Sequence, residues 1–370
     1  MKYYIIAGEA SGDLHAANLI KAIAKLDPKA EFRCWGGDRM QNAGGEIVKH
    51  IKELAFMGFS EVIMNARTIM KNLSFCKQDI LSYRPDAVIL VDYPGFNLRI
   101  AEFAHQAGLR VIYYISPQIW AWKKNRVLKI RRFVDKMLVI LPFEKDFYRQ
   151  FDFDVEFVGH PLLDVTGAPS VYQDRGEFIT KHKLSGKPLI AVLPGSRKQE
   201  ISRMLPVMAS LAGRFPDYDF VIAGAPSIDR GLYQKLAGHH ELTVLEDQTR
   251  ELLRYSYAAL VTSGTATLET ALYNVPQVVC YKGSTFSYLI ARQLVDVKFI
   301  SLVNLIMDRQ VVKELIQWDF NEENLYHELE MVLNKTWREN VIKDYNELHG
   351  RLGGQGASDR AAASIYKFLE

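Results

Sequence analysis

The stretch PLIAVLPGSRKQEI, residues 188–201, decides the fold. It begins with an apolar run of strand length, and the residues after it have helical spacing. The loop PGSR between them predicts a turn from a strand into a helix, with free backbone N–H groups at the positive end of the helix dipole. Arg197 in this loop can bind phosphate through paired hydrogen bonds, and Ser196 can add another. Alternatively, Arg197 pairs with Glu200 along one helix.

The same alternation of strand and helix runs through most of the chain, which predicts an α/β protein with doubly wound, Rossmann-like sheets. The strand-like runs are apolar on both faces, as buried parallel strands are. They lie at 3–8, 85–95, 110–117, 136–142, 155–161, 188–193, 217–224, 242–247, 258–262 and 275–281. From about Asn321 the sequence predicts helices.

A polar stretch without apolar periodicity, residues 166–187, predicts a linker between two domains. We therefore expect an N-terminal domain over 1–165 and a C-terminal domain over 166–345. Two such halves are expected to face a cleft. Ligands of open α/β sheets bind beyond the carboxyl ends of the strands, so the loops after strands are the candidate sites.

The composition is that of an ordinary globular protein, with 48% hydrophobic residues in 370 and a net charge of +3. This mild charge does not indicate nucleic acid. Three widely spaced cysteines suggest neither a disulfide framework nor a zinc site. The sequence shows no signal-peptide core and no apolar run long enough to span a membrane. A cytoplasmic protein that can touch a membrane surface is expected.

Two loops of the first half carry candidate catalytic residues. GEASGD, residues 8–13, supplies Glu9 and Asp13, with His15 nearby. This loop can lie against a sugar or a phosphate. Alternatively, it is a tight turn with Asp13 near a helix start. In VDYPGFN, Asp92 ends an apolar run, where desolvation raises a carboxyl pKa toward that of a useful base. The alternative is an Asp that binds the amides of its own turn.

A second phosphate-type turn lies in VTSGTATLETAL, residues 261–272. A strand enters the turn Ser263–Thr265, which includes Gly264, and a helix follows. Glu269, one helical turn on, can bind both hydroxyls of a ribose, or it is an ordinary surface carboxylate. Together with Gly195–Arg197 this turn predicts a nucleotide diphosphate site. These loops contain neither a Walker Lys-Ser/Thr pair nor a DxD, so no bound metal is expected.

Two further segments suit a membrane surface. Trp120 and Trp122 precede seven Lys or Arg residues within 123–136, a combination that fits phosphate beside apolar groups. The segment Leu54–Phe75 is richer in Phe and Met than a helix on a sheet needs. The alternative for the first segment is two core tryptophans beside a solvated helix face. The alternative for the second is ordinary packing of a helix in the core.

Seven motifs together resemble the lipid A disaccharide synthases, glycosyltransferases of the two-domain GT-B type. They appear in the family's order and run from residue 8 to residue 306. They are GEASGD, SPQIWAW, LPFEK, VGHP, LPGSR, SGTATLE and SLVNLI.

The resemblance implies an inverting transfer without a metal or other cofactor. The donor would be UDP-2,3-diacylglucosamine and the acceptor the 6-hydroxyl of 2,3-diacylglucosamine 1-phosphate, giving the β-1,6-linked disaccharide 1-phosphate and UDP. The resemblance also implies peripheral association with anionic lipids of the inner face of the cytoplasmic membrane. A homodimer is possible in the family, and residues 346–370 would cross back to the first domain or to a partner subunit.

The resemblance assigns roles to matched residues. Asp92 would be the base, although Glu9, Asp13 and His15 stay open as alternatives. Ser11 and Asp13 would lie at the reacting sugar.

In the second half, Arg197 would bind the diphosphate, and Glu269 and Asn304 would face the nucleotide. The chain departs from the family pattern at two positions. Gly95 stands where many relatives have a second carboxylate, and Val303 where many have Pro. The first departure weakens a mechanism with two carboxylates, and the second concerns the shape of the loop.

Three other functions fit parts of the sequence. A UDP-N-acetylglucosamine 2-epimerase has the same two-half architecture but needs no acceptor and no apolar patch. Another GT-B glycosyltransferase with a lipid acceptor would differ in that acceptor. A basic module that binds membranes or nucleic acid through Trp120–Lys136 would not need the loops at Arg197 and Glu269.

Overall fold

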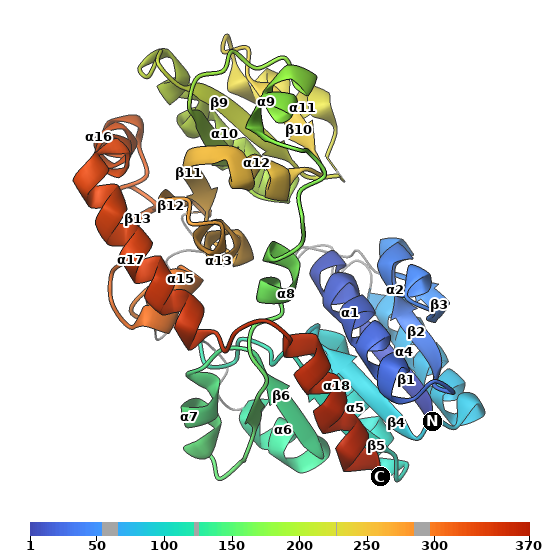
Figure 1. Cartoon of the computed structure of the whole chain (residues 1–370). Helices are drawn as coiled ribbons and strands as arrows, with labels where there is room; N and C mark the ends of the chain where they lie inside the picture. Colours follow the sequence, from blue (N-terminus) through green and yellow to red (C-terminus); the bar gives the residue numbers. More distant parts are fainter. Residues whose placement is uncertain (54–65, 122–125, 227, 285–296) are drawn as a thin grey trace. The chain divides into compact units, whose positions relative to one another are not determined.

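A computed structural model describes residues 1–53, 66–121, 126–226, 228–284 and 297–370 (Figure 1). The chain divides into two compact units. Unit 1 comprises Met1–Asp164 with Leu352–Glu370, and unit 2 comprises Val165–Arg351. Each unit contains one parallel sheet between layers of helices, so the predicted doubly wound α/β architecture is confirmed.

The sheet of unit 1 has the strand order β3-β2-β1-β4-β5-β6-β7, and every pair is parallel. The order reverses between β1 and β4, where Ala7 lies opposite Val91. The central strands are buried on both faces, which is why they read as continuous apolar runs. The strands are β1 (Lys2–Ala7), β2 (Glu31–Gly36), β3 (Glu46–His50), β4 (Ala87–Val91), β5 (Arg110–Tyr114), β6 (Lys136–Val139) and β7 (Glu156–Phe157).

Helices cover both faces of this sheet. On one face α4, α5 and α6 pack through residues such as Ile80, Ile100 and Ile130 against alternate strand residues such as Val88 and Leu90. On the other face α1 contacts α18. The helices of the unit are α1 (Ala10–Leu26), α2 (Asp38–Asn42), the 3-10 helix η1 (Ile51–Glu53), α4 (Ala66–Tyr83), α5 (Pro94–Gln106), α6 (Arg126–Phe133), α7 (Glu144–Arg149) and α18 (Ala357–Leu369), with α8 (Leu162–Thr166) at the boundary.

The C-terminal helix α18 belongs to unit 1, although the whole of unit 2, Val165–Arg351, separates it in sequence from the rest of that unit (Figure 1). Asp164 holds its first turn, because its carboxylate accepts from the amides of Gly356 (2.6 Å), Ala357 and Ser358. Arg360 Nε donates to the Val158 carbonyl at 2.8 Å. A side chain and the helix dipole thus fix this end of the chain on its own unit.

The sheet of unit 2 has the order β10-β9-β8-β11-β12-β13 and is parallel throughout. Here the order reverses between β8 and β11, where Leu193 lies opposite Val261. The strands are β8 (Leu189–Leu193), β9 (Asp219–Gly224), β10 (Thr243–Glu246), β11 (Ser256–Thr262), β12 (Gln277–Tyr281) and β13 (Lys313–Ile316).

Two apolar clusters cover the faces of this second sheet. One includes residues of α10 and α16, and the other includes residues of α9 and α12. The helices of the unit are α9 (Arg175–Lys181), α10 (Lys198–Ser210), the 3-10 helix η2 (Leu211–Gly213), α11 (Arg230–Ala237), α12 (Thr249–Tyr255), α13 (Thr265–Leu272), α15 (Leu302–Met307), α16 (Glu322–Leu333) and α17 (Lys335–Arg351).

The segment expected as a linker, 166–187, forms part of unit 2 instead. It contains α9, whose Phe178 is fully buried against the sheet, and Tyr172 is buried beside it. Burying one Phe side chain contributes about 1.5–3 kcal/mol. A short helix with a single apolar anchor has too little periodicity to be recognised in a polar sequence.

Candidate active-site loops on the two units

In unit 1 the loops after β1 and β4 lie at the point where the strand order reverses. Parallel neighbours end at the same edge of a sheet, so the backbone at Gly8 and Glu9 comes next to that at Asp92. A Cβ atom on Gly8 would lie 2.3 Å from the ring of Tyr93, so only glycine allows this approach. Glu9 is the residue before α1.

The backbone of Asp92 is held in an unusual conformation. Asp92 and Tyr93 both lie in the left-handed region, with φ of 46° and 49°. Two side chains fix the turn, because Asn97 Nδ2 (2.7 Å) and the Tyr113 hydroxyl (2.6 Å) both donate to the Asp92 carbonyl. Asn97 is fully buried. Strain of this kind persists only where the surroundings determine it, and it is typical of functional sites.

The carboxyl of Asp92 has the character of a general base. Burial, together with the nearby Glu9 carboxylate, raises its pKa to about 6. The residue is only half-buried by exposed area, so a substrate can still reach it. Tyr113 stays protonated because burial raises its pKa well above the ordinary value, and its O–H therefore remains a donor to the turn.

The other predicted residues of this region differ in their surroundings. Ser11 is exposed in the first turn of α1. Asp13 is buried, and its carboxylate accepts from the amides of Gly37 (2.7 Å), Arg39 (3.2 Å) and Met40 (3.1 Å) at the start of α2. Asp13 lies near a helix start, as expected, because it is in the first turn of α1. Its carboxylate, however, caps the start of α2.

In unit 2 the loops after β8 and β11 occupy the corresponding edge. Gly195 has φ of +112°, and a Cβ there would lie 2.8 Å from Glu200 Oε2. Arg197 is the N-terminal cap residue of α10, with 53% of its side chain exposed. The carboxylate of Glu200 binds two residues of this loop. It accepts a hydrogen bond from Arg197 Nη1 at 3.0 Å and one from the Ser196 amide at 3.3 Å. A carboxylate of the chain thus lies where an anion would bind.

The turn after β11 supplies the second set of exposed donors. Gly264 and Thr265 are exposed, and Gly264 has φ of +156°. The hydroxyl of Ser263 donates to the Ile300 carbonyl at 2.9 Å, and the Ser263 amide donates to the Cys280 carbonyl. The β8 and β11 ends are neighbours in the sheet, so the two predicted phosphate turns lie on one edge of unit 2.

Glu269 is paired rather than free on the surface. Its Oε1 lies 3.3 Å from Nε of Arg250 on α12, and burial raises its pKa. The sequence does not point to Arg250, because no motif marks it. A pair of this kind orients the carboxylate of Glu269.

Asn304 lies inside unit 2. Its side chain is fully buried, its Oδ1 accepts from the amides of Val311 and Val312, and its Nδ2 donates to the Val312 carbonyl and to Glu314. Glu314 also binds Ser301. All four hydrogen-bonding positions of the amide are used, so Asn304 holds its loop together.

Two other quoted motifs hold unit 1 together. In LPFEK the fully buried Glu144 accepts from the amides of Ile140 and Leu141, and burial raises its pKa to about 8. In VGHP the amide of His160 donates to the Leu352 carbonyl, where the chain re-enters unit 1. Trp120 is buried edge-on against Phe143, which favours the core alternative for this tryptophan.

Some expectations fall outside the described residues: Trp122 and residues 54–65 of the apolar segment. Over the ranges that the structure does describe, no cluster of three His, Cys, Asp or Glu side chains is arranged to hold a metal ion. Within the same ranges, no helix has both the length and the hydropathy that crossing a bilayer requires.

The fold of the chain is similar to that of several solved structures. It is similar to the UDP-GlcNAc 2-epimerase of Methanocaldococcus jannaschii in complex with UDP-GlcNAc and UDP, with a TM-score of 0.68 at 14% identity, covering 100% of both chains. It is also similar to the glycosyltransferase of kitacinnamycin, with a TM-score of 0.66 at 13% identity, covering 100% of this chain and 99% of that one. Likeness at such low identity shows the GT-B type of fold and no more.

Sequence relatives decide the activity. The family model described as lipid-A-disaccharide synthetase matches residues 3–367. The lipid-A-disaccharide synthase of Syntrophus aciditrophicus is 40% identical over 375 residues, covering 99% of this chain and 97% of the relative. That of Myxococcus xanthus is 39% identical over 372 residues, with the same coverage. The chain belongs to the lipid-A-disaccharide synthase family, the glycosyltransferases of lipid A biosynthesis.

Proposed function

We propose that the chain transfers the sugar of UDP-2,3-diacylglucosamine to the 6-hydroxyl of 2,3-diacylglucosamine 1-phosphate, giving the β-1,6-linked disaccharide 1-phosphate and UDP. One observation carries the assignment of the base. Asp92 directly follows the central strand β4, its backbone is held by Asn97 and Tyr113, and its pKa is raised to about 6. A base with that pKa is ionised at neutral pH and still accepts a proton readily.

The proposed reaction is a single displacement. The acceptor oxygen forms a bond to the anomeric carbon and passes its proton to the Asp92 carboxylate. The bond between that carbon and the diphosphate oxygen breaks, and the electron pair leaves with UDP. Attack opposite the leaving group inverts the anomeric centre. Glu9 supports Asp92 because its negative charge helps to keep the pKa raised.

Unit 2 supplies the groups that stabilise the leaving diphosphate in this proposal. Arg197 and the amides of Gly195–Ser196 bind one phosphate, and the turn Ser263–Thr265, with Gly264, binds the other. The diphosphate displaces the Glu200 carboxylate from Arg197. Glu269, oriented by Arg250, binds the ribose hydroxyls.

The remaining predicted residues support this site. Asn304 positions the loop that carries Ser301. Ser301 adjoins Ile300, whose carbonyl accepts the Ser263 hydroxyl. Ser11 contacts the reacting sugar from the first turn of α1, and Asp13 fixes the start of α2 beneath that loop.

We also propose peripheral attachment to anionic lipids at the inner face of the cytoplasmic membrane. Large apolar side chains are exposed beside cations on two helices of unit 1. Met70 is 65% exposed next to Lys71 on α4, and Leu128 is 59% exposed next to Lys129 on α6. Apolar groups next to cations suit the boundary between acyl chains and headgroups. Unit 1 closes around α18 of its own chain, so the proposal requires no exchange with a partner subunit.

The test is an assay of the purified protein with both substrates in detergent and EDTA, read by mass spectrometry. A tetraacyl disaccharide 1-phosphate with an equal amount of UDP is expected. Folded protein that binds UDP but forms no disaccharide would overturn the proposal, and interconversion of UDP-N-acetylglucosamine epimers would replace it with the epimerase activity.

A further inference from the structure

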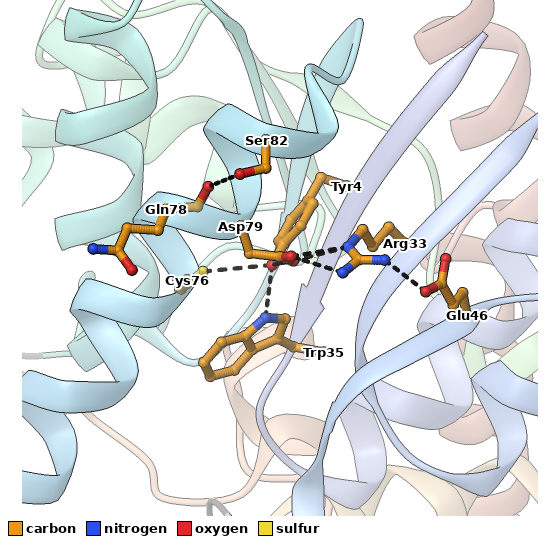
Figure 2. Close-up of polar contacts among 8 residues, drawn as sticks. All are labelled: Tyr4, Arg33, Trp35, Glu46, Cys76, Gln78, Asp79 and Ser82. Carbon is orange, nitrogen blue, oxygen red and sulfur yellow. Dashed lines mark hydrogen bonds and ion pairs between the residues drawn. The ribbon is translucent and has the colours of Figure 1, made fainter.

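A polar network joins the first two strands of unit 1 to α4 (Figure 2). At its centre the Tyr4 hydroxyl on β1 donates to Asp79 Oδ2 on α4 at 2.7 Å and accepts from Trp35 Nε1 on β2 at 2.8 Å. Asp79 also accepts from Nε and Nη2 of Arg33, at 2.9 Å and 2.7 Å, and Arg33 Nη1 donates to Glu46. Tyr4 and Trp35 are fully buried. The network thus holds a Trp ring inside the unit by its one polar atom.

The hydrogen bonds of this network fix an orientation that packing alone leaves free. An apolar core of the same volume needs no polar atoms, and buried polar atoms destabilise a fold unless they are hydrogen-bonded. The Trp35 indole has a single donor, which has to point at the Tyr4 hydroxyl. Asp79 is fixed in turn, because two nitrogens of Arg33 bind its carboxylate. The indole ring is therefore held in one orientation.

The oriented ring is linked to the Asp92 turn by two aromatic contacts. The ring centroids of Trp35 and Phe96 lie 5.2 Å apart, and those of Phe96 and Tyr93 lie 5.7 Å apart. Both distances are within the range that aromatic pairs prefer. Phe96 is buried and precedes Asn97, whose Nδ2 donates to the Asp92 carbonyl. A shift of the indole ring would therefore reach residues that hold the turn.

Tyr93 also lies against the loop that carries Glu9. Atoms of its ring would be 2.3–2.6 Å from a Cβ on Gly8, so the ring covers this glycine closely. Glu9 follows Gly8, and its carboxylate acts together with burial to raise the pKa of Asp92 to about 6. Because the ring meets one loop and the backbone of Tyr93 continues the other, the position of this residue sets the spacing of the two loops.

We propose that Trp35 is a positioning residue for Asp92. Its ring, held by the network, keeps Phe96 and Tyr93 in the places that the left-handed turn at Asp92 requires. In this role Trp35 acts only through its neighbours. The inference rests on the proposed function, in which Asp92 is the base, and adds to it a group on β2 that controls the geometry of that base.

The first test removes the hydrogen bond of the indole and leaves its ring unchanged. In Tyr4→Phe the kcat for disaccharide formation is expected to fall about tenfold, because a displaced base reacts poorly. The KM for the donor is expected to change less than twofold. Tyr3→Phe is the matched control, since Tyr3 is the next residue of β1, is equally buried, and faces the other side of the sheet. Equal losses of kcat in the two variants would overturn the inference.

The pH profile separates positioning from a general loss of stability. A loosened turn lets water reach Asp92, so its pKa falls toward the ordinary value of an aspartate. The acid limb of kcat/KM should therefore move to lower pH by about half a unit or more in Tyr4→Phe and stay in place in Tyr3→Phe. A general loss of stability lowers the melting temperature and leaves the limb where it is. A limb that does not move in Tyr4→Phe would overturn the inference.

Hydrogen exchange tests the inference without any activity. The Asn97 amide donates to the Tyr93 carbonyl at 3.0 Å, so its exchange reports opening of the turn. Tyr4→Phe is expected to speed this exchange about tenfold, whereas Tyr3→Phe leaves it unchanged and β5 stays protected in both. No change at the turn would contradict the inference, and so would an equal increase across the whole sheet.

A second variant, Trp35→Phe, shortens the ring and so weakens its contact with Phe96. It is expected to show the same fall in kcat, the same shift of the acid limb and the same faster exchange, and melting temperatures verify that each variant folds. Normal values for all three would overturn the inference. If the unaltered protein forms no disaccharide, the proposed function fails, whereas the role of Trp35 in holding the turn still stands or falls on hydrogen exchange.

Discussion

The turns at Asp92 and at Arg197 have the same position in their sheets and opposite surroundings. Each follows a central strand at the edge where the strand order reverses. The Asp92 turn is held from below by the buried side chains of Asn97 and Tyr113. The Arg197 turn is held from the solvent side, by a single carboxylate of its own helix.

The difference fits the roles that we propose for Asp92 and Arg197. A base needs a fixed position and partial burial, since these raise its pKa and aim it. A phosphate-binding Arg has to exchange partners, so an exposed ion pair with Glu200, worth about 0–1 kcal/mol, suits it better than a buried one. In the proposed function, the corresponding edges of the two sheets thus supply a rigidly held base in unit 1 and an exchangeable cation in unit 2.

The strongest test of the rigid turn is Asp92→Asn. The amide keeps the shape of the side chain but cannot take the proton, so kcat is expected to fall by about 10²–10⁴-fold. Steady-state kinetics measure it, and UDP affinity and melting temperature serve as controls. A kcat within threefold of the unaltered protein would move the base to Glu9 or His15.

Two single variants, Arg197→Ala and Glu200→Gln, test the turn at Arg197. Loss of the Arg is expected to lower kcat/KM for the donor about 10–100-fold, because charged hydrogen bonds to the diphosphate disappear. Loss of the competing charge at residue 200 is expected to leave the KM for the donor equal or lower. A large rise in KM for Glu200→Gln would show instead that the ion pair is needed to shape the site.

Asn97→Ala tests whether the rigid turn depends on its buried support. The carbonyl of Asp92 loses one of two side-chain donors, so unfolding by urea should show a loss of about 1–3 kcal/mol, with a reduced kcat. Ser196→Ala in the exposed turn is the matched change, expected to stay within about 0.5 kcal/mol. Equal losses of stability in the two variants would remove the contrast between the turns.

The smallest expected effect concerns pH. Below the Asp92 pKa of about 6 the base is protonated, so kcat/KM should fall tenfold per pH unit on the acid side and level off above it. Glu9→Gln removes a negative charge that raises this pKa, so the acid limb should move to lower pH by less than one unit. A limb that moves to higher pH, or is absent, would contradict the electrostatic assignment.

Most strands of the two sheets were predicted from their apolar runs, including the edge strands β7 and β10, but β2, β3 and β13 were not. β1, β4 and β8 are apolar on both faces and stand out, whereas β3 and β13 mix charged and apolar residues and were not predicted. Edge strands bury one face at most, so their composition resembles that of loops. β2 was missed for a similar reason, since EFRCWG places Glu31 and Arg33 among its apolar residues.

The site residues divide in the same way. Asp92, Arg197 and Ser263–Thr265 were predicted because each follows a recognisable strand. Asn97, Tyr113 and Arg250 were not, because their roles depend on contacts with residues from 5 to 21 positions away. Spacing within a motif carries no information about such partners.

The sequence by itself determined the α/β class, the loops that carry polar residues, and the family. These follow from local apolar patterns and short motifs. Only the tertiary structure decided that Asp13 caps α2, that Glu200 occupies the Arg197 turn, and that α18 closes unit 1 through Asp164. The reason is physical: a carboxylate binds whichever amides or cations the packed strands and helices bring within about 3 Å, and that choice is made in three dimensions.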